Sequence, residues 1–312
     1  MPRPAPFHPY YSPYNSPLAM KTTEPPIFLD VPALLESSEP RPRVPWLWYG
    51  AAGFGVMMIL SLFEKRSPQA QQAFEVISGF ILFTLMALVA VVGVYSVRQV
   101  KAAQQAIENV AELIQLRRWP QAAILVGDTL SRPARSRQLQ AQALAYLASV
   151  LVRYHRYEDS IAVLNHLLES GFLDEQTTVG LRLSRAMAML HEDHLFDADR
   201  AINDLRRSPA SGSAGLALVE IYRDVKTGHP DDAINTFEQK KTVIRDQLGH
   251  RMADAYGLCA KAFDLKDRKT EAAEAWKNAT LLAPVTELLR RYPELEKLAG
   301  RYAVAPSPPE LA

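Results

Sequence analysis

Residues 253–284 read ADAYGLCAKAFDLKDRKTEAAEAWKNATLLAP, and this stretch decides the fold of the chain. Apolar side chains recur at three- and four-residue steps on both sides of the polar turn Asp267-Arg268-Lys269, a spacing that places them on one face of each of two helices. Ala260 and Ala272 are small residues where two helices cross closely. Pro284 then ends the second helix. The stretch therefore predicts a helical hairpin with a buried seam.

Fainter copies of this hairpin occur from residue 100 onward. A small residue near the start of each second helix recurs at intervals of about 32 to 41 residues, and these residues are Ala122, Ser160, Ala201, Ala233 and Ala272. Trp276 and Ala279 continue the apolar face of the last unit. We therefore expect residues 100–284 to form repeated helix pairs in which these seven residues pack between helices.

The order of aromatic residues, small residues, turn and closing proline in residues 253–284 resembles the tetratricopeptide repeat. The resemblance implies an α-solenoid, because one helix pair cannot bury its apolar face without a neighbour. It also implies a concave groove for a protein or peptide partner. The candidate partner-binding residues on the groove-facing helices are Ser149, Arg153, Lys261 and Asp264.

Some members of that family hold acidic C-terminal peptides with a clamp of lysine and asparagine. In this chain Ala111 and Ser149 stand at the groove-facing positions of the first two units, and Lys261 is alone in the last. The resemblance therefore implies a partner other than an acidic C-terminal tail.

Two uncharged apolar runs precede the repeats, at residues 44–63 and 77–97. Each holds about 20 residues, enough for a helix to cross the roughly 30 Å hydrocarbon core of a bilayer. We therefore expect a two-helix transmembrane hairpin over residues 44–97. The first run contains Gly50, Gly53 and Gly55, so a re-entrant or tightly packed first helix is the alternative.

Basic residues around the hairpin predict its orientation through the positive-inside rule. Those outside the hairpin are Arg41, Arg43, Arg98, Lys101, Arg117 and Arg118, and those in its turn are Lys65 and Arg66. The excess on the outer flanks favours both termini in the cytoplasm. We further expect a disordered leader rich in proline and tyrosine over residues 1–43, a C-terminal capping helix over 285–302 and a disordered tail over 303–312.

Three short motifs are candidates for catalytic or metal sites. The histidines of His191-Glu192-Asp193-His194 are spaced by three residues rather than the four of a zincin helix, which favours a solvated turn. Cys259 lies on an apolar stripe and is expected to be a buried packing thiol. Gly212-Ser213-Ala214-Gly215 lacks the preceding strand of a nucleophile elbow. The sequence therefore favours a non-enzymatic protein with no catalytic residues, no metal and no cofactor.

The net charge of +1 argues against nucleic-acid binding, because neutralising phosphates requires a basic face. The expected function is a membrane-anchored helical-repeat scaffold that recruits a protein partner through its groove, with the repeats in the cytoplasm. Two alternatives remain open at this point. One is an extracytoplasmic envelope-assembly factor, and the other is an accessory subunit of a membrane complex.

Overall fold

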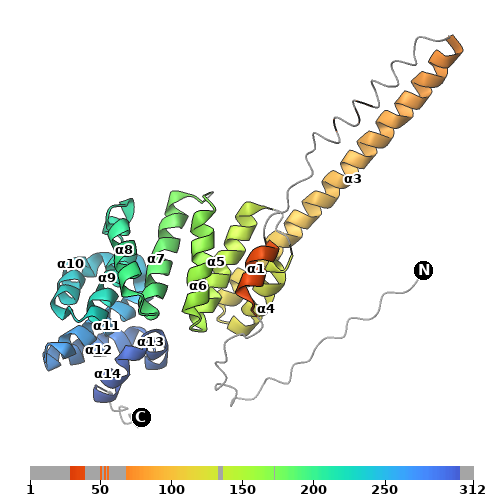
Figure 1. The fold of residues 1–312 in the computed structure, drawn as a ribbon. Coiled ribbons are helices and arrows are strands. Elements are labelled where there is room, and N and C mark those ends of the chain that lie inside the picture. The colour runs from red at the N-terminus through yellow and green to blue at the C-terminus, as the bar shows by residue number, and fades with distance from the viewer. Residues whose placement is uncertain are drawn as a thin grey trace, which may run out of the picture.

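The structure is a computed structural model that describes residues 29–38, 50, 53, 55, 68–132, 136–171 and 173–302. These residues form helices joined by short turns, with no strand among them. The predicted all-α fold is therefore confirmed. Figure 1 shows a row of packed helices from which one long helix, α3, projects.

Successive helices pack as pairs, which together we call the array. The pairs are the C-terminal part of α3 (Pro68–Gln115) with α4 (Trp119–Leu130), α5 (Arg137–Arg153) with α6 (Tyr157–Glu169), α7 (Glu175–His191) with α8 (Leu195–Arg206), α9 (Ala214–Thr227) with α10 (Pro230–Leu248), and α11 (Met252–Leu265) with α12 (Lys269–Leu282). Each pair also contacts the pair before it. The 3-10 turns η1 (Pro209–Gly212) and η2 (Gly249–Arg251) precede α9 and α11.

The same turn joins the two helices of every pair. One residue of each turn has a left-handed backbone, and these residues are Arg117, His155, Asp193, Gly228 and Asp267. The next residue donates its backbone N–H to the carbonyl five positions earlier at 2.8–2.9 Å, the bond that closes a helix C-terminus in a Schellman motif. The turns recur at intervals of about 35 to 39 residues, so the sequence repeat is also a backbone repeat.

These turns correct the register of the third unit. In four units the small residue lies five positions after the left-handed one, as Ala272 follows Asp267. In the third unit that position is Ala198, not Ala201. Both are buried because they lie three residues apart on one face of α8. Each of the seven residues proposed for repeat packing is buried; they are Ala122, Ser160, Ala201, Ala233, Ala272, Trp276 and Ala279.

Part of the expected leader is folded. Within residues 1–43, the structure has helix α1 (Val31–Ser38), which packs against α4 and α6. Leu29 and Val31 are buried in the same apolar cluster as α4 and α5. The Asp30 carboxylate accepts the N–H of Ala33 at 3.2 Å and so begins the helix. The expectation of disorder was therefore wrong for residues 29–38, and the remainder of the leader lies outside the described residues.

The C-terminal segment, residues 285–301, differs from the single capping helix that we expected. It consists of α13 (Val285–Arg291), η3 (Pro293–Leu295) and α14 (Glu296–Arg301). The break falls at Tyr292, which is extended (φ −132°, ψ 82°) before Pro293, because the residue before a proline disfavours helical backbone. The main contacts of the segment with the array are with α11. The tail over 303–312 lies outside the described residues.

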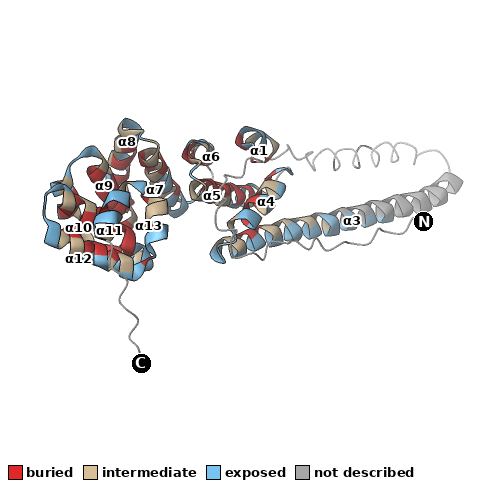
Figure 2. Cartoon of the chain, turned by 90° about the horizontal axis from the view of Figure 1, so that it is seen from below, coloured by how far each residue is buried: buried red, intermediate tan, exposed pale blue. Residues whose placement is uncertain are grey.

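Buried residues form two large clusters along the array, and Figure 2 marks buried positions in red along the packed helices. One cluster joins α1, α3 and α4 to α6, and the other joins α7 to α14. Between them lies a small cluster of Tyr157, Ile161 and Ala188. The first cluster also includes Leu181 of α7, so apolar packing continues across α6 and α7.

Among the residues that the structure describes, no helix is both long enough and apolar enough to cross a membrane. The run at 44–63 lies outside the described residues, apart from Gly50, Gly53 and Gly55. The run at 77–97 lies within α3, where only some side chains are described. α3 itself is one continuous helix of 48 residues.

Candidate functional site

One stripe of α5 leads to the candidate site. Gln138, Gln142, Tyr146, Ser149 and Arg153 follow one another at three- and four-residue steps, so they share one side of the helix. Two of these, Ser149 and Arg153, are predicted partner-binding residues. We use the name inner face of the array for the surface that this side of α5 forms together with the corresponding sides of the other first helices, α3, α7, α9 and α11.

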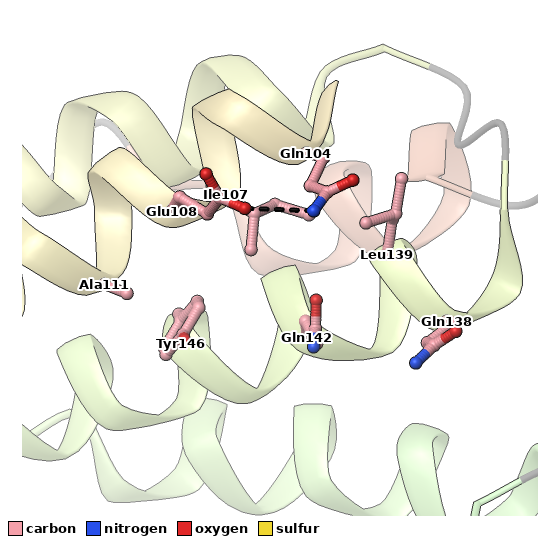
Figure 3. Close-up of a pocket in the computed structure, with 8 residues that line it drawn as sticks. All are labelled: Gln104, Ile107, Glu108, Ala111, Gln138, Leu139, Gln142 and Tyr146. Atoms are coloured by element: carbon pink, nitrogen blue, oxygen red, sulfur yellow. Dashed lines mark hydrogen bonds between the residues drawn. The ribbon is translucent and has the colours of Figure 1, made fainter. Parts of the chain in front are cut away.

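At the α3–α5 end, the described residues leave part of the inner face uncovered. A cavity of about 300 Å³ lies between α3 and α5 (Figure 3). Its lining residues are Gln104, Ile107, Glu108, Ala111, Gln138, Leu139, Gln142 and Tyr146. Three of these side chains are amides that both donate and accept hydrogen bonds, the pattern that an extended peptide backbone requires. Gln104 Nε2 donates to Glu108 Oε1 at 3.0 Å, and Glu108 is the charged residue of the lining.

At the other end the C-terminal segment covers the inner face. Arg153 Nη1 lies 3.1 Å from both carboxylate oxygens of Glu287 on α13. Arg290 binds the same carboxylate at 2.8 Å and donates to the Arg153 carbonyl at 3.3 Å. Burial opposes ionisation of Glu287, but the hydrogen bonds from Arg290 and Arg153 lower its pKa to about 2. Arg153 is therefore bound by the chain's own C-terminal segment.

Aromatic side chains from three helices meet beside this ion pair. The Tyr157 and His191 rings stack with centroids 4.5 Å apart and an interplanar angle of 8°, and His191 also contacts Tyr222 and Tyr292. The Tyr222 hydroxyl lies 3.1 Å from His191 Nδ1 and donates to Glu294 Oε1 at 2.8 Å. Burial and the charge of Lys226 lower the pKa of His191 to about 3, and burial raises that of Tyr157 to about 12.

The expectation of a solvated His191 turn therefore needs correction. Asp193 and His194 do form the turn after α7, but His191 lies in the last turn of α7 and packs against tyrosines. Its neutral ring suits this buried stack. Within the described ranges, no group of three or more histidine, cysteine, aspartate or glutamate side chains is placed to hold a metal ion.

A stripe of α11 lies beneath the C-terminal segment. Asp254, which is fully buried, is paired with Arg291 and Arg251. Gly257 faces Leu295 so closely that an added Cβ would lie 3.1 Å from its Cδ1. Asp264 is bound by Arg301 and accepts the Tyr302 hydroxyl at 3.1 Å. The predicted binding residue Asp264 is thus partnered within the chain, and Lys261 lies between it and Gly257 on the same stripe.

The surroundings of the two remaining catalytic candidates, Cys259 and Ser213, indicate structural roles. Cys259 is fully buried, and burial raises the pKa of its thiol, which disfavours the reactive thiolate. Ser213 is the N-cap of α9, and its hydroxyl accepts the N–H of Leu216 at 3.2 Å. Neither side chain contacts a histidine that could act as a base in the part of the chain described.

Sequence reasoning missed the residues that cover the inner face. Leu288, Tyr292, Leu295 and Leu298 are all buried in the second apolar cluster. Their spacing of three and four residues is visible in the sequence, but it predicts only a helix with one apolar side. It does not tell which surface that side covers.

No protein-family model, curated protein or solved structure matches this chain. The geometry of the inner face is therefore the basis for assigning a function.

Proposed function

We propose that this protein is a membrane-anchored helical-repeat scaffold, without enzymatic activity, that recruits a protein partner. The observation that carries the proposal is the open cavity between α3 and α5. Its amide side chains suit the backbone of a bound peptide, while Ile107, Leu139 and Tyr146 offer apolar contact. The single charge, on Glu108, favours a peptide that carries a basic residue.

The repeated turn supports a tetratricopeptide-like α-solenoid. Five helix pairs share the same left-handed residue and the same closing hydrogen bond, and each pair packs on its neighbour. Stacked pairs of this kind build an extended surface from equivalent helices, which is the usual binding surface of such arrays. The inner face is that surface in our proposal.

Exposed apolar side chains on α3 support the membrane anchor. Phe83, Val91, Val94, Tyr95 and Val97 are all exposed, and at about 100° per residue they lie within an arc of about 160° of the helix surface. An exposed apolar surface of this breadth on the described part of a helix suits a lipid environment. Residues 44–97 are accordingly proposed to be a two-span hairpin.

The docking of α1 supports an even number of spans. Residues 29–38 precede the two apolar runs, and yet they pack on α4, α5 and α6. Ser37 Oγ donates to the Leu130 carbonyl at 3.0 Å, and Arg156 Nη1 donates to the Leu29 carbonyl at 2.9 Å. Because both flanks of the hairpin belong to one folded unit, they lie on the same side of any membrane. The basic flanks favour the cytoplasm as that side in our proposal.

A photo-crosslinking experiment tests the recruitment site. A crosslinking amino acid at Gln142, in the cavity, should join the full-length chain to a defined partner in native membranes. The same amino acid at exposed Gln239 on α10 is the matched control. Gln142→Arg should remove the partner from proximity labelling while Gln239→Arg keeps it. Equal crosslinking from both positions, or partner loss in neither variant, would contradict the proposal.

The alternatives predict other outcomes. An envelope-assembly factor would carry the array outside the cytoplasm. An accessory subunit would instead crosslink through its spans, for example at Ala51 or Gly55, whose separation of four residues allows close helix approach.

A further inference from the structure

We propose that the α9–α11 end of the inner face is itself a peptide-binding surface, which the C-terminal segment occupies as an exchangeable internal ligand. A partner of matching chemistry would bind by replacing residues 285–301. This surface is distinct from the α3–α5 cavity, and the inference does not depend on that cavity binding a partner.

The first argument is where the segment lies. Along the array, each new pair begins by packing against the second helix of the pair before it, as α11 packs against α10. A segment that continued the array would therefore pack mainly against α12. Residues 285–301 instead return to α11, where α13, η3 and α14 all make contact, and Figure 1 shows α13 and α14 beside α11. The segment covers the inner face rather than extending it.

The second argument is the chemistry of the contacts. Four apolar anchors, Leu288, Tyr292, Leu295 and Leu298, are buried. Ion pairs hold both ends: Arg291 and Arg301 bind Asp254 and Asp264 on α11, and Glu287 binds Arg153 on α5. The surface therefore recognises a short amphipathic segment with an acidic residue before its apolar anchors and basic residues among and after them. A partner segment of this composition is the class that we expect to compete.

The third argument is that the fit leaves polar atoms unsatisfied. Glu294 Oε2 is buried without a hydrogen-bond partner, and Arg291 Nε has only the ion-pair contact with Glu287 Oε1 at 3.6 Å, a costly arrangement for buried polar groups. Both belong to the C-terminal segment. A competing segment whose polar atoms at these two positions are all hydrogen-bonded would bind more tightly than residues 285–301 do.

The fourth argument is the tether. Residues 283 and 284 have extended backbone between α12 and α13, so the segment is joined to the array by a short link. A short link holds a ligand at an effective concentration on the order of millimolar, so even a segment of micromolar intrinsic affinity occupies its site almost fully. A competing segment must therefore overcome this tether, and cutting the link should make the exchange much easier to observe.

The test uses the full chain with a protease site inserted between Leu282 and Val285, purified in detergent and cleaved after folding. A fluorescent peptide of residues 285–302 should then enter the cleaved chain, and its anisotropy should rise at least tenfold more than with uncleaved chain. A peptide with Leu295→Arg should not enter. A peptide with Glu296→Arg is the matched control and should enter normally, because Glu296 is exposed.

A second variant keeps the test decisive if the inserted site disturbs folding. In uncleaved chain, Leu295→Arg should displace the internal segment and allow the wild-type peptide to bind. Circular dichroism should show that the array remains helical. If the cleaved chain unfolds, or if neither preparation takes up peptide, then residues 285–301 are a permanent part of the core and the proposal is overturned.

Discussion

Arg153 on α5 and Glu287 on α13 form an ion pair in which one guanidinium nitrogen lies 3.1 Å from both carboxylate oxygens. Both side chains are about a quarter exposed. The pair joins α5, in the first half of the array, to the C-terminal segment.

A double-mutant cycle with Arg153→Gln and Glu287→Gln measures this link. We expect a coupling free energy of about 0.5–1 kcal/mol in urea unfolding, since the pair is only partly buried. The matched cycle on Arg245 and Asp246, an exposed pair on α10, should give a coupling near zero. Equal coupling in both cycles would show that Glu287 does not hold the two halves together.

The stability of the protein should fall as the pH drops from 7 to 5. His191 has a folded pKa of about 3, whereas an unfolded histidine titrates near 6.5, so the unfolded state binds the extra proton in this range. The expected contribution of His191 is about 2 kcal/mol of unfolding free energy. His191→Gln should flatten the pH dependence in denaturant unfolding, and His166→Gln is the control. An unchanged slope in the His191 variant would contradict this assignment.

Two glycine substitutions should have opposite signs. Gly228 has φ +76° in the turn between α9 and α10, with no atom within 4 Å of an added Cβ, so Gly228→Ala should cost about 1–2 kcal/mol from backbone strain alone. Gly180 is exposed within α7 and is equally free of close neighbours. Gly180→Ala should stabilise by about 0.5–1 kcal/mol because alanine favours helix. Thermal unfolding of both variants, compared with that of the wild-type chain, measures the two changes in stability.

Ala272→Arg should destabilise the array by about 3–5 kcal/mol. Ala272 is fully buried where α12 meets α11, so arginine would both overpack the crossing and bury a charge. Glu274→Arg, on the exposed side of the same helix, should change stability by under about 0.5 kcal/mol. Urea midpoints compare the two. Similar losses would mean that the crossing is not tightly packed.

Reporters fused before Met1 and after Ala312 should both lie in the cytoplasm. The prediction combines the basic flanks with the docking of residues 29–38 onto the array. Protease protection of sealed vesicles or a paired fluorescence and phosphatase reporter measures it. Reporters on opposite sides would exclude the hairpin, and reporters both outside would favour the envelope-assembly alternative.

Local patterns were enough to locate the helix pairs. The turn residues and the small residues that follow them act within one hairpin, so their spacing is legible in the sequence. In the third unit the sequence pattern indicated Ala201, whereas the repeat position is Ala198, and this difference shows the limit of the approach. Both residues lie on the buried face of α8, and periodicity alone does not choose between them. The left-handed turn at Asp193 decides the register, and a non-glycine residue gives little warning of it.

Long-range contacts were beyond the sequence patterns. Helix α1 is short and begins with Val31-Pro32 in a proline-rich region, and its stability comes from α4 and α6. The α3–α5 cavity requires residues from two helices whose pairing no motif records. Residues 285–301 read as one amphipathic helix, whereas tertiary contacts to α5, α9 and α11 place them on the inner face.

Because α3 is continuous, the array is rigidly connected to the apolar run of the same helix. The helix runs unbroken from Pro68 to Gln115, so no hinge separates the apolar run from the residues that line the cavity. From Val97 to Gln104 the helix advances about 10 Å and completes nearly two turns. This fixes both the distance of the cavity from the apolar run along the helix axis and its direction around that axis. Each residue inserted in this interval would move the cavity by about 1.5 Å along the helix axis and rotate it by about 100° around that axis. A partner that twists the array would therefore turn the apolar run with it.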